Sequence, residues 1–230
     1  MASERPRAAR PPRRYGIVLV ILIASYLLSA FFNAKWINDT QTALFTVAVL
    51  LAVRNSEWLG SRARAVVAAG LAGSMIGIIA AVHLAGPEGR GAGAIWTGML
   101  LLLTVMLIVR QVLLQSAVTL QSIYGVISAY LIIGLMFASF YSAMWWLGGR
   151  TFFAPAGSHA GSLSDFQYFS FTTLTTLGYG DFTAAANAGR AIAMIEAMTG
   201  QIFLATLVAK LVAAFRPTAA AARQDDGARD

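Results

Sequence analysis

The sequence lacks cysteine and contains little charge. None of the 230 residues is Cys, which excludes disulfide bonds and thiolate metal sites. Charged residues make up only 12% of the chain and hydrophobic residues 58%, whereas soluble domains have about 25% charged and about 45–50% apolar residues. This composition predicts an integral membrane protein. No nucleophile–base pair, phosphate loop or metal-ligand cluster is evident either, so the sequence predicts no enzyme and no cofactor.

The sequence contains several long apolar runs. A bilayer-spanning helix needs about 20 mostly apolar residues. Runs of suitable character occur at 15–32, 40–53, 64–84, 93–113, 123–147 and 187–214, of which 40–53 is the weakest. We therefore expect an all-α membrane protein with six transmembrane helices.

The basic residues indicate how these helices are oriented. Six crossings place thirteen of the seventeen Lys and Arg residues on the same side as both termini. Cytoplasmic segments carry such an excess of positive charge. The net charge of +7 is then explained by membrane orientation rather than by nucleic-acid binding. We expect both termini to be cytoplasmic and the protein to lie in the cell (plasma) membrane.

The chain divides into two membrane units and two tails. Residues 1–14 and 217–230 are predicted to be cytoplasmic tails, the first of them disordered. Residues 15–113 are predicted to form a four-helix transmembrane unit. Polar residues at 111, 115, 119 and 122 give a stripe that fits either a helix lying in the inner interface or a straight continuation of the fourth helix.

A short segment within 114–216 carries the chemistry. Residues 164–175 predict an amphipathic helix, with Ser164 and Gln167 as a capping box and Asp165 in its first turn. About twelve residues at a rise of about 1.5 Å each cannot cross a bilayer, so this helix is expected to be re-entrant. Its C-terminal end would direct the negative pole of the helix dipole at a central cavity.

A glycine-tyrosine-glycine motif follows this helix directly, within Thr176-Leu177-Gly178-Tyr179-Gly180-Asp181. Gly178 and Gly180 can adopt positive φ without a Cβ penalty, so successive carbonyls can point in one direction. Four such segments around an axis would form stacked oxygen rings that replace the water around a cation. The motif resembles the selectivity filter of potassium channels, the general example of carbonyl-based ion selectivity. The resemblance extends over residues 121–215.

This resemblance implies a six-transmembrane-helix tetrameric potassium channel of the prokaryotic type, with 114–216 as its pore domain of outer helix, pore helix, filter and inner helix. The implied selectivity filter, whose first four carbonyls would coordinate K⁺, comprises Thr176, Leu177, Gly178, Tyr179 and Gly180. The implied filter supports are Thr175, Asp181, Tyr168, Phe169 and Thr172. Leu177 and Phe169 replace the family's frequent Val and Trp, and Thr172 stands where some relatives have a buried Glu. Because Phe169 has no donor, we expect the Tyr168 hydroxyl to bond the Asp181 carboxylate at about 2.5–2.7 Å.

Two residues of the last apolar run are further candidates. Glu196 is a carboxylate in the middle of the membrane, where such groups are costly and usually functional. It is either a strut to the threonines of the pore helix or a group that acts directly in permeation or gating. Gly200 is either the gating hinge of the inner helix or a site of close helix packing.

The fourth apolar run, 93–113, contains a single basic residue, Arg110, at its cytoplasmic end. Voltage sensors supply about 3–4 gating charges per subunit, so no voltage sensor is expected. The sequence therefore predicts a homotetramer in the lipid bilayer that passively conducts K⁺, its only implied ligand. Two alternatives stay open: a non-conducting scaffold or regulatory subunit with the pore fold, and a transporter subunit built from repeated filter loops, of which only one is present.

Overall fold

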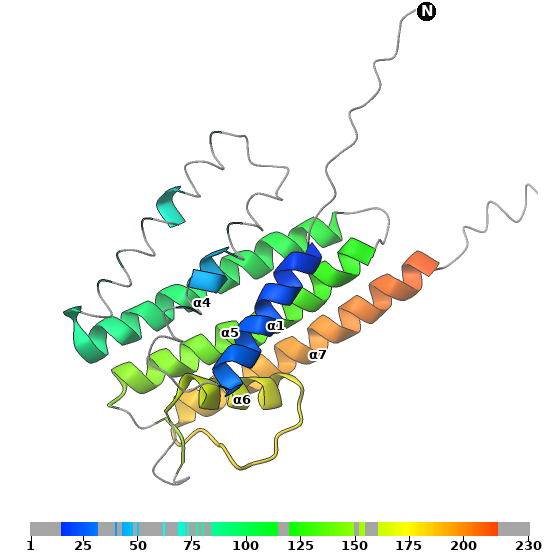
Figure 1. Ribbon diagram of the computed structural model, residues 1–230. Coiled ribbons are helices and arrows are strands. Elements are labelled where there is room, and N and C mark those ends of the chain that lie inside the picture. Colours follow the sequence, from blue (N-terminus) through cyan, green and yellow to red (C-terminus); the bar gives the residue numbers. More distant parts are fainter. Residues whose placement is uncertain are drawn as a thin grey trace, which may run out of the picture.

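A computed structural model gives the fold of the chain (Figure 1). It describes residues 15–31, 84–114, 120–149, 152–154 and 161–215, with scattered positions between 40 and 80. The helices labelled in Figure 1 are α1 (Tyr15–Phe31), α4 (Gly86–Leu113), α5 (Leu120–Leu147), α6 (Leu163–Leu174) and α7 (Asn187–Phe215).

Three of these helices are long and apolar enough to cross a membrane: α4, α5 and the Asn187–Lys210 part of α7. The described part of the chain is therefore all-helical and consistent with an all-α membrane protein. Helix α1 has 17 residues and is shorter than these three. The predicted helices at 40–53 and 64–84 fall mainly outside the described residues, as do both predicted tails. The count of six crossings stays a prediction.

Helix α4 begins earlier than its apolar run suggested. The run starts at residue 93, whereas the helix starts at Gly86. Pro87 stands in the first turn, where its missing N–H has no helical partner to lose, and Glu88 complements the positive end of the helix dipole. Hydropathy missed this first part because its residues are small or polar.

The polar stripe at 111–122 lies only partly within the described residues. Helix α4 ends at Leu113 and α5 begins at Leu120, so residue 111 belongs to one helix and residue 122 to the next. Residues 115–119 lie outside the described part of the chain. The end of α4 at Leu113 contradicts a straight continuation of the fourth helix, whereas the helix in the inner interface stays a prediction.

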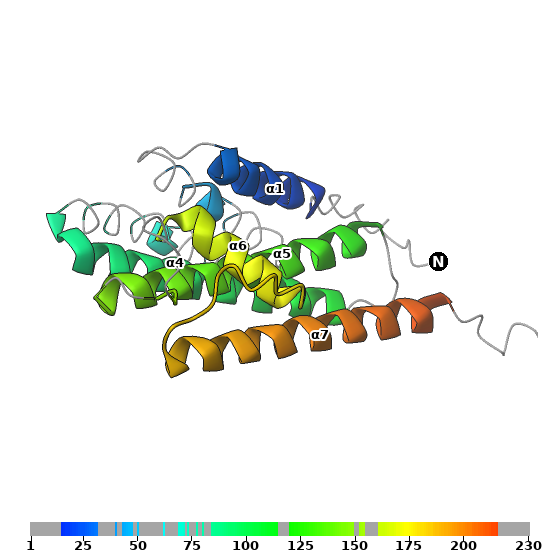
Figure 2. The ribbon, with the colours of Figure 1, turned by 90° about the horizontal axis from the view of Figure 1, so that it is seen from below.

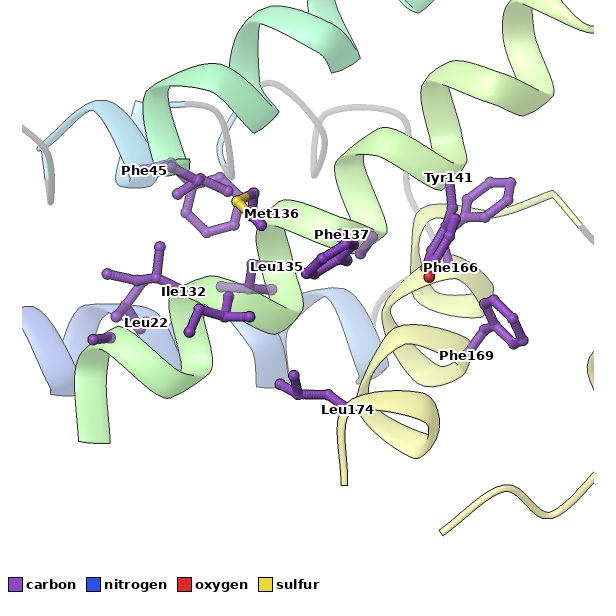
Figure 3. Packing of buried hydrophobic residues seen from close by; sticks show 14 of the residues in the cluster. Leu22, Phe45, Ile132, Leu135, Met136, Phe137, Tyr141, Phe166, Phe169 and Leu174 are labelled. Atoms are coloured by element: carbon purple, nitrogen blue, oxygen red, sulfur yellow. The ribbon is translucent and has the colours of Figure 1, made fainter. Parts of the chain in front are cut away.

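Helix α5 is central to the packing. It runs along α4 and contacts α1, α6 and α7, and Figure 2 shows α1 and α7 on opposite sides of it. The core lies along α5, where Ile132 and Leu135 meet Leu22 of α1 and Leu174 of α6 (Figure 3). The outer end of this core is aromatic, with Tyr141 close to α6. The short helix α6 is thereby held against the bundle by apolar packing.

Candidate functional site

Helix α6 starts at a capping box that sequence analysis placed two residues too late. The N-cap is Ser162, whose hydroxyl accepts from the Asp165 amide at 3.2 Å. The Asp165 carboxylate accepts in return from the amides of Ser162, at 2.9 Å, and Gly161, at 3.0 Å. An ionised carboxylate is a stronger acceptor than the amide of Gln167. Gln167, the expected partner, is buried instead.

The backbone after α6 alternates in conformation. Gly178 has φ 52° and Gly180 φ 84°, which confirms the positive φ expected of both glycines. Thr176 also has positive φ, at 57°. This was not expected, because a β-branched residue is a genuine outlier in the left-handed region. Every second residue from 176 to 180 is therefore left-handed, and one of them at a cost in strain.

Hydrogen bonds to the end of α6 hold this strained segment. The Leu177 and Gly178 amides both donate to the Thr172 carbonyl, at 2.9 and 3.1 Å, and the Thr176 amide donates to Thr173 at 2.9 Å. The Thr175 hydroxyl donates to the Phe171 carbonyl at 2.7 Å. The first amides of the candidate filter thus point back at α6.

Tyr168 supports the other end of the segment. Its hydroxyl donates to the Asp181 carboxylate at 2.8 Å, so the expected hydrogen bond is present, slightly longer than expected. Its ring lies parallel to that of Tyr179, with 6.5 Å between centroids and 6° between planes. The hydrogen bond to Asp181 raises the pKa of Tyr168, because the carboxylate stabilises the protonated phenol.

Phe169 points in a different direction from its neighbour. Its ring is buried and packs edge-on against Tyr141, Phe152 and Phe153. Together with Thr172, it also lines a cavity of about 310 Å³ that borders both filter glycines. Tyr168 therefore contacts the filter segment directly, whereas Phe169 anchors α6 in the core.

Glu196 has no accessible surface within the chain. Tyr141 of α5 donates to its Oε2 at 2.6 Å, and its Oε1 forms a hydrogen bond with Ser170 of α6. The carboxyl group is thus a strut to the short helix, although through a serine and not through the threonines that we expected. Its complete burial favours this strut over a group in direct contact with permeating ions.

Gly200 packs closely against the end of α6. A Cβ atom at this position would lie 2.3 Å from the Leu174 carbonyl oxygen. The same carbonyl accepts from the Tyr130 hydroxyl at 3.4 Å. The geometry therefore supports the close-packing interpretation of Gly200, and the hinge stays a prediction.

Sequence reasoning missed four residues of this site: Tyr130, Tyr141, Ser170 and Gln201. The Gln201 amide lies 3.4 Å from the Thr176 hydroxyl, within donor distance. Its amide side chain, beside Gly200 in the middle of a long and mainly apolar helix, was a usable signal. The tyrosines and the serine gave none, because their partners are distant in sequence, such as Glu196, which is 55 residues from Tyr141.

The described residues define a class: an all-helical protein of the membrane type, in which a short capped helix packs between two long apolar helices and leads into an exposed segment with two glycines. Residues 123–216, which include nearly all of α5 and all of α6 and α7, match the family model described as "Ion channel". The match supports an ion channel family and ion channel function, and this is not an enzyme family. A search of curated proteins found no match.

Proposed function

We propose that four copies of this chain form a potassium-selective channel that conducts K⁺ passively, with Thr176 to Gly180 as the filter. The observation that carries the proposal is the left-handed backbone at Thr176, Gly178 and Gly180. In a chain that alternates in this way, successive carbonyls can face one side. The amides of Leu177 and Gly178 are already committed to α6, which leaves that side to carbonyl oxygens.

The carbonyls of Thr176, Leu177, Gly178 and Tyr179 would then form four oxygen rings in a tetramer, as in carbonyl-lined filters generally. The Thr176 hydroxyl would complete the innermost site. The C-terminal end of α6 adds the negative pole of its macrodipole just below these rings. Cations are favoured at such a position and anions are not.

The exposed surface of the single chain supports assembly. Leu177 is 55% exposed and Tyr179 67% exposed, although both belong to the segment proposed as the filter. Large apolar side chains of α7, including Met194, Met198 and Ile202, are exposed as well. Exposed apolar side chains of a membrane helix face lipid or another subunit, and one chain supplies only one filter strand. Closed fourfold symmetry would bury these side chains and complete the rings.

Ion flux into lipid vesicles tests the proposal. Purified protein is reconstituted, and reversal potentials are measured with K⁺ and Na⁺ on opposite sides. We expect K⁺ to be strongly preferred. Changing Tyr179→Asp should make Na⁺ permeant while the tetramer remains intact, because the filter backbone loses the aromatic ring that packs on Tyr168.

The control variant is Tyr124→Phe, in α5 and remote from the filter, which should leave the preference unchanged. If the unmodified protein conducts both ions equally, the potassium filter is refuted. If an intact tetramer conducts no ion at any voltage, pH or lipid composition, the chain is a non-conducting scaffold instead.

A further inference from the structure

The hydrogen bonds around Glu196 present a problem of proton counting. The Ser170 hydroxyl lies 2.6 Å from the Gly134 carbonyl oxygen of α5 and is also hydrogen-bonded to Glu196 Oε1. The Tyr141 hydroxyl donates to Glu196 Oε2. Three contacts therefore join α5, α6 and α7 through one serine, one tyrosine, one carbonyl and one carboxyl group.

An ionised Glu196 cannot satisfy all three contacts. Carbonyl and carboxylate oxygens only accept, and each hydroxyl has a single proton. Tyr141 and Ser170 together supply two protons for three contacts. If Ser170 donated to Glu196, its oxygen would face the Gly134 oxygen at 2.6 Å with no proton between them.

A protonated Glu196 satisfies every contact. Ser170 then donates to Gly134, the acid O–H of Glu196 donates to Ser170, and Tyr141 donates to the remaining acid oxygen. Buried polar groups are nearly always hydrogen-bonded, so the arrangement in which all three contacts have a proton is the favoured one.

Among the described residues, those that surround Glu196 offer no positive charge to balance an ionised form. Helix α5 has no acidic or basic residue, and its titratable groups facing Glu196 are Tyr130 and Tyr141. In α6 the charged residue is Asp165, which is bonded to the N-cap, and the other titratable group is Tyr168, which is bonded to Asp181. The basic residues of α7 bond elsewhere: Arg190 to the Ala184 carbonyl and Lys210 to the Val112 carbonyl. Leaving a buried charge without a partner is strongly unfavourable.

We propose that Glu196 is a neutral carboxylic acid and that its proton, donated to Ser170, positions the short helix α6 between α5 and α7. Glu196 is thus a positioning residue that acts on the filter through α6. The contribution of this contact to stability is complete only below the ordinary carboxyl pKa of about 4.3, because above it the unfolded chain ionises Glu196 while the folded protein keeps the proton. It falls as the pH rises and is lost once the folded protein also releases the proton, because Ser170 then has two acceptors and one proton.

Glu196→Gln is the matched variant. The glutamine amide N–H replaces the acid O–H as the donor to Ser170, and its carbonyl oxygen still accepts from Tyr141. All three contacts survive, and the side chain cannot lose a proton in the accessible pH range. Glu196→Leu fills a similar volume and removes both contacts of the carboxyl group.

The primary test is infrared spectroscopy of the protein in lipid, which does not depend on the proposed channel function. The wild-type protein at neutral pH should show the carbonyl stretch of a protonated carboxylic acid, absent from the Glu196→Gln protein and shifted in Tyr141→Phe. Absence of that band from a folded wild-type protein would overturn the proposal.

Thermal stability and flux are then measured against pH. We expect the thermal stability of the wild-type protein to decline as the pH rises above the ordinary carboxyl range, and its flux to be lost at alkaline pH, where the folded protein releases the proton. Glu196→Gln should conduct like the wild type at neutral pH and should show neither decline. Glu196→Leu should be impaired at every pH. If Glu196→Gln fails to fold, or keeps the alkaline decline of the wild type, the neutral-acid assignment is wrong. A failure of flux alone, with the infrared band present, would count against the channel function and not against the protonation of Glu196.

Discussion

At the scale of single residues, Thr176 is held in a conformation that its side chain disfavours. A β-branched residue at φ 57° stores strain, and its retention depends on bonds at both ends of the segment. One end is tied to α6 through amides of the segment, and the other through Tyr168 and Asp181. Removing one of these bonds should let the strained segment relax more readily. Channels whose filter has not yet collapsed should keep their ion selectivity.

We therefore predict that Tyr168→Phe speeds the collapse of the filter into a non-conducting form without changing K⁺ preference in the open state. The hydroxyl bonded to Asp181 is lost, whereas the ring beside Tyr179 is kept. Current decay during sustained opening measures this rate. Tyr124→Phe serves as the control, since it removes a hydroxyl from α5. Wild-type decay in Tyr168→Phe would show that the hydrogen bond does not stabilise the filter.

At the scale of elements, α6 is fixed by contacts at each end and along its length. The capping box closes its start, Ser170 links its middle to α5 and α7, and the Leu174 carbonyl at its end accepts from Tyr130. Gly200 allows α7 to approach that same carbonyl. A separate bond from Lys210 to the Val112 carbonyl joins the far part of α7 to the end of α4.

Gly200→Ala distinguishes close packing from a hinge. The added Cβ would meet the Leu174 oxygen at 2.3 Å, so packing predicts a loss of about 1–3 kcal/mol in unfolding free energy. A hinge with free space around it predicts the reverse, a gain of about 1 kcal/mol from helix propensity with reduced opening. Thermal unfolding in detergent measures the sign. The matched control is Gly16→Ala in α1, where the new methyl would be 3.7 Å from Tyr124, an ordinary contact.

At the scale of the whole molecule, the charge that could respond to voltage is small. The described part of α4 has Arg90 near its first turn, packed over the Trp146 ring, and Arg110 in its last turn. Both lie at helix ends and neither forms part of a regular series. The described bundle therefore offers the membrane field little to move.

We predict a shallow conductance–voltage relation, with a gating charge near or below about one per subunit, against about 3–4 for a voltage sensor. Macroscopic currents from reconstituted protein over a wide voltage range give this value. Arg110→Gln should leave the slope nearly unchanged. A steep relation that flattens in Arg110→Gln would identify α4 as a sensor.

The sequence by itself determined those features of the protein that depend on residues close together in the chain. Hydropathy located the long helices α5 and α7 to within a few residues, and the glycines indicated positive φ at 178 and 180. The bond from Tyr168 to Asp181 was implied by the resemblance to potassium channels, and the lack of a donor on Phe169 assigned it to Tyr168. Boundaries set by small or polar residues were less predictable, as the start of α4 and the cap of α6 show. The capping box shifted because Asp165 is a better acceptor than Gln167.

Only the tertiary structure decided what depends on contacts between distant segments. Glu196 could be recognised in the sequence as an unusual carboxylate, but its partners Tyr141 and Ser170 are 55 and 26 residues away. Nothing in their local sequence marks them, because serine and tyrosine are ordinary in apolar helices. The strain at Thr176 was equally hidden, since local propensity opposes it and bonds at both ends of the segment sustain it. Burial and three-dimensional packing, which no local pattern encodes, turn these scattered polar groups into one site.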